Sequence, residues 1–143
     1  MNLFRQINQT VADVVAQPAL NSVLILAARI LMAAIFISAG VSKLGDGYAG
    51  TAGYMESMGL PGALLPLVIL LEIGGGLALV AGFQTRLAAL ALAVFSIVSG
   101  VIFHGGADQM QQILFMKNLA MAGGLLAFTV FGGGRLSLDG ETR

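Results

Sequence analysis

Residues 62–83 read GALLPLVILLEIGGGLALVAGF, an apolar run with one charged residue, Glu72, near its middle. A helix of this length rises about 33 Å, which is enough to cross the hydrocarbon core of a bilayer. The Glu72 carboxylate would then lie near the membrane midplane, where an ionised group is costly unless it is paired, protonated or hydrated. The stretch therefore predicts a membrane-spanning helix. It also predicts a group elsewhere in the chain that pairs with the Glu72 carboxylate.

The composition of the whole chain also indicates a membrane protein. Hydrophobic residues make up 57% of the 143 residues and charged residues 10%, against roughly 45–50% and about 25% in soluble domains. The mean hydropathy is +0.92. A soluble fold would lack the polar residues to coat its surface, so we expect a single integral membrane domain.

Several function classes are excluded by residue counts. The formal net charge is zero, so no basic face for nucleic acid is expected. Cysteine is absent and His104 is the sole histidine, which excludes iron–sulfur clusters and a bis-histidine haem within one chain. No metal-ligand spacing, nucleophile–base pair or phosphate loop is visible, so enzyme activity stays an open question. A redox role would need a cofactor or substrate carried by another molecule, or a diffusible quinone.

Three further apolar runs accompany the first. The predicted spans are residues 21–43, 62–82, 86–104 and 113–131. The connections at 83–85 and 105–112 are short, which favours antiparallel neighbours. We therefore predict an all-α membrane protein, a four-transmembrane-helix up-down bundle. Asn21 is the expected N-cap of the first span, Lys43 is expected to snorkel at its far end, and residues 45–61 are expected to form a glycine-rich loop.

A different pattern occupies the N-terminus. One helical stripe of residues 3–17 is apolar, and Pro18 ends the pattern; its members are Leu3, Ile7, Val11, Val14 and Val15. This predicts an amphipathic helix lying in the membrane surface. The expected divisions are thus an amphipathic segment (1–20), the transmembrane domain (21–135) and a tail (136–143).

The loop cations predict the orientation. Lys43 lies on one side of the predicted membrane domain, whereas four cations lie on the other, namely Arg5, Arg86, Arg135 and Arg143. The positive-inside rule then places both termini and the tail in the cytoplasm.

Four ionisable side chains fall within the spans. From the 1.5 Å rise, Arg29 lies about 12 Å from the cytoplasmic end, Glu72 about 15 Å, Lys117 about 21 Å and His104 about 27 Å. An Arg29–Glu72 pair is therefore expected, with Lys117 as the next cation. Asn118 lies about 100° around the helix from Lys117. The candidate ligand-binding cluster is Arg29, Glu72, Lys117, His104 and Asn118.

Three interpretations of this cluster stay open. It could line a wet pocket for a polar head group such as that of a quinone, because intramembrane ionisable groups are usually functional and two cations face one carboxylate. It could instead be a buried bridge that fixes helix register. A weaker alternative is a pathway for protons or a small solute, with His104 as the group near its outer end.

Several strings resemble one known family. They are ARILMAAIFISAGVSKL (28–44), LLEIGGGLALVAGFQTR (70–86), FMKNLAMAGGLLAF (115–128) and GGGRLSLDG (132–140), together with Tyr54-Met55 and Met58-Gly59-Leu60-Pro61. In this order they are similar to the DoxX family of inner-membrane proteins, over about residues 24–140.

The resemblance implies a four-helix bundle in the bacterial inner membrane. It also implies a link to membrane redox systems, since the family name comes from a subunit of a thiosulfate:quinone oxidoreductase. The expectation is a small subunit or accessory of a quinone-linked system, with the lipid bilayer, a membrane redox protein and a second copy of the chain as candidate partners. A quinone is the candidate cofactor, and no residue is implied to be catalytic.

Overall fold

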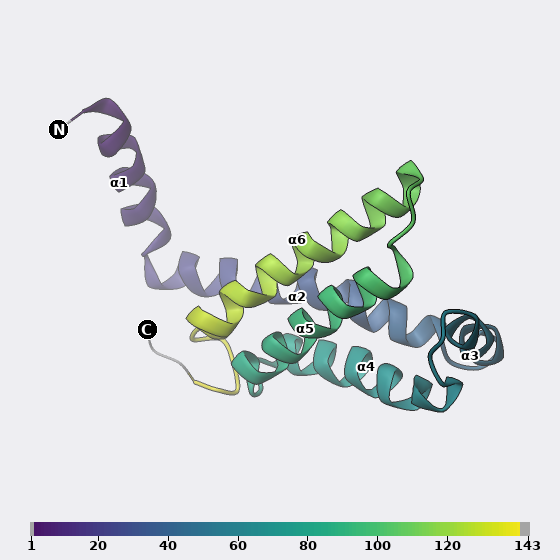
Figure 1. Ribbon diagram of the computed structural model, residues 1–143. Coiled ribbons are helices and arrows are strands. Elements are labelled where there is room, and N and C mark those ends of the chain that lie inside the picture. Colours follow the sequence, from purple (N-terminus) through teal and green to yellow (C-terminus); the bar gives the residue numbers. More distant parts are fainter. Residues whose placement is uncertain (1, 141–143) are drawn as a thin grey trace.

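A computed structural model describes residues 2–140 of the chain (Figure 1). Met1 and residues 141–143 lie outside the described part. The last of them, Arg143, is one of the cations used to predict the orientation. Within the described part the structure contains helices and no strand. The elements are α1 (Leu3–Val15), α2 (Pro18–Ser42), α3 (Gly47–Ser57), the short 3₁₀ helix η1 (Gly62–Leu64), α4 (Leu65–Ala81), α5 (Thr85–Phe103) and α6 (Gln109–Phe131).

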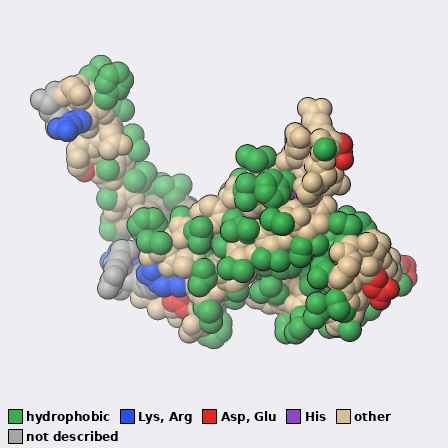
Figure 2. All heavy atoms as spheres, viewed as in Figure 1, with side chains coloured by type: hydrophobic (Ala, Val, Ile, Leu, Met, Phe, Trp, Pro, Cys, Tyr) green, Lys and Arg blue, Asp and Glu red, His purple; other side chains and the backbone are tan. Residues whose placement is uncertain are grey.

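Four of these helical segments are long and apolar enough to cross a membrane: α2, η1 with α4, α5 and α6. They confirm the predicted four-span, all-α membrane fold. Figure 1 shows α1, residues 132–140 and the α4–α5 turn at one end of the molecule, hereafter the terminal end. Helix α3 and the α5–α6 connection lie at the other end, hereafter the α3 end. Hydrophobic side chains cover much of the face of the bundle seen in Figure 2, as contact with lipid requires.

The spans pack as two tight pairs. Helix α2 packs along α4, and α5 packs along α6, while α6 meets α2 only slightly. Glycines let the first pair approach closely: a Cβ at Gly40 would meet Ile73, and one at Gly76 would meet Ile37. The buried core where the pairs meet includes Phe36, Leu79, Leu92 and Leu125. The bundle is therefore well filled toward the terminal end and more open between α2 and α6.

Two local predictions are corrected. The first span begins at Pro18, with Gln17 at its N-cap and no capping side chain, so Asn21 lies inside the helix. Proline suits the first helical position because its missing N–H would have no partner there. The expected loop at 45–61 contains helix α3, which the sequence conceals because its glycines lower helix propensity.

Residues 132–140, the C-terminal clasp, bind the terminal end of the bundle. The backbone N–H groups of Leu138 and Asp139 donate to Ala81 O (3.0 Å) and Gly82 O (2.8 Å), at the end of α4. The Asp139 carboxylate accepts hydrogen bonds from the backbone N–H groups of Gln84 (2.7 Å) and Thr85 (2.8 Å), at the start of α5. The clasp thus satisfies polar backbone groups of two helix ends that would otherwise be exposed at the membrane surface.

Asp139 gives the clasp a dependence on pH. Burial acts to raise the pKa of this carboxyl group, but hydrogen bonds from Thr85 and Gln84 and the positive charge of Arg29 outweigh it, so the pKa lies below its ordinary value. A depressed carboxyl pKa stabilises the fold above the ordinary pKa of about 4, and this contribution is lost as the pH falls through the folded-state value.

Asp139→Ala should therefore cost about 1 kcal/mol at neutral pH, the usual value of a helix N-cap. The difference in melting temperature between the variant and the original protein should shrink as the pH is lowered below 4, measured in detergent micelles. A difference that stays constant down to pH 2.5 would show that the ionised carboxylate is not the stabilising group.

Candidate functional site: a cavity at the α3 end

A cavity of about 460 Å³ lies among α2, α3, α4, α5 and α6, toward the α3 end. Its wall is mainly apolar and aromatic, and the residues of this kind include Phe36, Tyr54, Met55, Leu60, Leu64, Val68, Phe95, Ile102, Phe103 and Met121. A few polar side chains interrupt this wall: Lys43, Thr51, Glu72, Ser99, His104, Lys117 and Asn118. A mainly apolar cavity with a small number of polar groups is the usual form of a small-molecule site.

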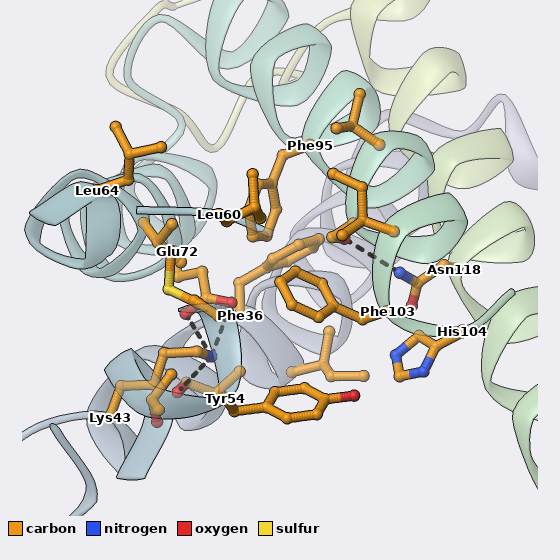
Figure 3. A pocket seen from close by; sticks show the side chains of 18 of the residues that line it. Phe36, Lys43, Tyr54, Leu60, Leu64, Glu72, Phe95, Phe103, His104 and Asn118 are labelled. Atoms are coloured by element: carbon orange, nitrogen blue, oxygen red, sulfur yellow. Dashed lines mark hydrogen bonds and ion pairs between the residues drawn. The ribbon is translucent and has the colours of Figure 1, made fainter. Parts of the chain in front are cut away.

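Glu72 forms an ion pair with Lys43. The Lys43 ammonium donates to both carboxylate oxygens, Oε1 at 3.0 Å and Oε2 at 2.8 Å, and to the carbonyl oxygen of Ala39 at 3.1 Å. The Glu72 side chain is 6% exposed and that of Lys43 is 21% exposed. The ammonium thus has three acceptor oxygens, and the Lys43–Glu72 pair forms part of one wall of the cavity (Figure 3).

The predicted Arg29–Glu72 pair is wrong. Arg29 does not line the cavity; it is fully buried, and its guanidinium donates to Leu136 O in the C-terminal clasp. The distance along the helix axis was a sound guide to depth. It could not show that the long Lys43 side chain turns back from the C-cap of α2 into the bundle instead of snorkelling outward.

The other three predicted residues do line the cavity. Asn118 is buried and donates to Ser96 O (2.9 Å) and Ser99 Oγ (3.2 Å), so it ties α6 to α5. His104, at the C-cap of α5, has Nδ1 2.9 Å from Gln111 Oε1. The structure thus brings Glu72, His104, Lys117 and Asn118 to one cavity, and Figure 3 shows His104 and Asn118 on the side opposite the Lys43–Glu72 pair.

Helix α3 supplies the wall that sequence reasoning missed. Met55 is 4% exposed and points into the bundle from this helix. The ring of Tyr54 lies 5.5 Å from that of Phe103 on α5, at an interplanar angle of 30°. Tyr54 and Met55 belong to a string quoted above for its family resemblance, and that was the available signal that this segment forms part of the site.

The polar side chains of the cavity wall are hydrogen-bonding groups. Among residues 2–140 no group of three or more histidine or acidic side chains could hold a metal ion. The polar atoms offered to a ligand are an ammonium, an imidazole, a phenol and hydroxyls, which hydrogen-bond to carbonyl, hydroxyl or anionic groups.

The fold and the cavity define a four-span integral membrane protein with an intramembrane pocket. The chain belongs to the DoxX family: the DoxX family model matches residues 24–105. It is 50% identical over 121 residues to the inner membrane protein YqjF of Escherichia coli (strain K12), covering 84% of this chain and 92% of the relative. It is 36% identical over 129 residues to the inner membrane protein YphA of the same organism, covering 85% and 91%.

No solved structure matches the chain significantly. The family assignment confirms the resemblance, and the relatives identify the membrane as the inner membrane. This is therefore an integral inner-membrane protein of the DoxX family.

Proposed function

We propose that the cavity binds a small amphipathic molecule with a quinone-like head, and that the protein serves as an accessory or small subunit of a membrane redox system. The main observation in support of this proposal is the cavity itself. Its volume of about 460 Å³ falls in the range of roughly 300–1,000 Å³ typical of ligand sites, and a bundle built only for stability would fill this space with side chains.

The cavity walls fit an aromatic ring with hydrogen-bond acceptors. Phe36, Phe95 and Phe103 offer ring faces and edges for stacking. The ammonium of Lys117 and the phenol of Tyr54 are donors suited to the carbonyl oxygens of a quinone. The loose contact between α2 and α6 would let an isoprenoid or acyl tail remain in the lipid.

We also infer the orientation from the loop cations. Within the described part, Arg5, Arg86 and Arg135 lie toward the terminal end, and Lys43 lies toward the α3 end with its charge committed to Glu72. The positive-inside rule then supports cytoplasmic termini and a cavity in the periplasmic half of the membrane.

One observation favours a purely structural or interaction role as the second candidate. The Lys43 ammonium contacts both carboxylate oxygens of Glu72 and the carbonyl oxygen of Ala39, as expected of a bridge that fixes helix register. A proton or solute pathway has less support, because the apolar side chains of Ala33, Leu79 and Leu92 fill the core toward the terminal end.

Because the chain contains no tryptophan, one introduced tryptophan reports binding at a chosen place. Phe103→Trp puts the reporter on the cavity wall, and Phe131→Trp puts a matched control at the last residue of α6, 77% exposed, near the terminal end. Titrating a short-chain ubiquinone analogue into nanodiscs should quench the first reporter saturably and the second only in proportion to quinone in the bilayer.

A cavity-filling variant provides the second control. Ala39→Leu enlarges a half-buried side chain of the cavity wall, so adding it to the Phe103→Trp protein should weaken saturable quenching about tenfold or more. Identical, unsaturable quenching of both reporters would overturn the ligand-binding proposal and leave the structural one.

A further inference from the structure

The cavity wall contains more lysines than carboxylates. It contains two lysines and one carboxylate, and Lys43 is already matched with Glu72. The side-chain ammonium of Lys117, an exposed residue, makes no hydrogen bond or ion pair with any residue in the described range 2–140. Within the described residues, one lysine of this intramembrane site is therefore left without an acidic partner.

The position of Lys117 suggests what compensates it. Three of the first four residues of α6, at positions 109–112, are glutamines, and the continuous apolar run of the helix begins at Ile113. Four residues of helix place the Lys117 Cα about 6 Å deeper than Ile113, within reach of the headgroup boundary for a snorkelling lysine. His104, at the C-terminal end of α5, lies on the same cavity wall.

From this charge arrangement we propose that the cavity selects amphiphiles with a negatively charged head, which contacts Lys117 while the apolar part lies against the aromatic wall. This inference deepens the function proposed above by naming the charge of the ligand. Two sources supply the same chemistry: a ring compound with an ionised hydroxyl group, or an acyl chain with a carboxylate.

Lys117 would act here as a specificity residue. A charge-assisted hydrogen bond is roughly twice as strong as a neutral one. A neutral ligand of the same shape would accept only a weaker hydrogen bond from the ammonium through its carbonyl or hydroxyl oxygens. Preference for the anion should therefore be about tenfold in affinity.

The test uses two matched pairs of probes. The ring pair is 2-hydroxy-1,4-naphthoquinone, ionised at neutral pH, and 2-methoxy-1,4-naphthoquinone, which is neutral. The chain pair is dodecanoate and dodecanol. Affinities are measured at pH 7.5 from quenching of the Phe103→Trp reporter for the ring pair and from the shift in melting temperature for both pairs.

We expect the anionic member of at least one pair to bind about tenfold more tightly than its neutral partner. Lys117→Gln should remove this preference and Lys117→Arg should retain it. Arg135→Gln removes a cation from an exposed position near the terminal end and should leave the preference unchanged.

The outcomes separate this inference from the proposed function. Saturable binding of both naphthoquinones with equal affinity would overturn the anion preference and leave the quinone-like site standing. Selective binding of dodecanoate with no quinone binding would support the anion site and overturn the quinone-like head. A preference that survives Lys117→Gln, or one lost equally in Arg135→Gln, would overturn the role of Lys117, and no binding of any probe would overturn both proposals.

Discussion

Lys43→Met is expected to destabilise the protein by about 2–4 kcal/mol, because it leaves the Glu72 carboxylate buried without its partner. Breaking a fully buried ion pair costs about 3–5 kcal/mol, and the 21% exposure of the Lys43 side chain reduces this figure. Glu72→Met should cost less, about 1 kcal/mol, because Lys43 lies at the end of α2 and its ammonium can then snorkel toward the membrane surface.

The double variant Lys43→Met, Glu72→Met should recover most of the loss in stability, to within about 1 kcal/mol of the original protein. In this variant both charges are gone, so no buried charge is left without a partner. Free energies of unfolding in a mild detergent with added denaturant give the double-mutant cycle. Equal costs for the two single variants, or additive costs in the double variant, would contradict the view that the buried carboxylate depends on this one lysine.

Gly82→Ala should cost about 2–5 kcal/mol, although it adds a single methyl group. Gly82 follows α4 with φ at +66°, in the left-handed region where a side chain is strained. A Cβ there would overlap the buried Arg29 guanidinium and Ser137 of the C-terminal clasp, and overpacking of a filled site adds about 1–3 kcal/mol.

Gly123→Ala is the matched control for this change. A Cβ at Gly123, on α6, would meet nothing within 4 Å, so its melting temperature should stay within a few degrees of the original. Limited proteolysis of the C-terminus measures the clasp directly and should accelerate only in Gly82→Ala. An unchanged melting temperature for Gly82→Ala would mean that the clasp does not stabilise the bundle.

The spans could be predicted because lipid imposes one simple requirement. A segment that crosses the hydrocarbon must be helical, long and apolar, so hydropathy gave the four spans to within a few residues of their observed ends. The short connections then determined the up-down order, which brought α1 and residues 132–140 to one end of the molecule.

The pairing of charges could not be predicted in the same way. Axial rise gives the depth of Arg29 and Glu72, but not which way each side chain turns or which neighbour reaches it first. Arg29 is held by the carbonyl of Leu136, in a clasp formed by residues more than a hundred positions away. Long-range contacts of this kind leave little local signal.

Helix α3 was missed for a related reason. Its glycines at 47, 50 and 53 weaken any helical pattern, and the helix contributes to the bundle chiefly through Met55, which is buried under tertiary packing. The part of the cavity wall that α3 forms could therefore not be predicted from the sequence. Four of the five predicted site residues nevertheless line the cavity.

Ligand binding in the cavity is tested most directly by quenching of the Phe103→Trp reporter with a quinone analogue, beside the Phe131→Trp control. We predict saturable quenching at the cavity position alone, weakened by Ala39→Leu. Quenching that is linear and equal at both positions, and indifferent to Ala39→Leu, would contradict the account.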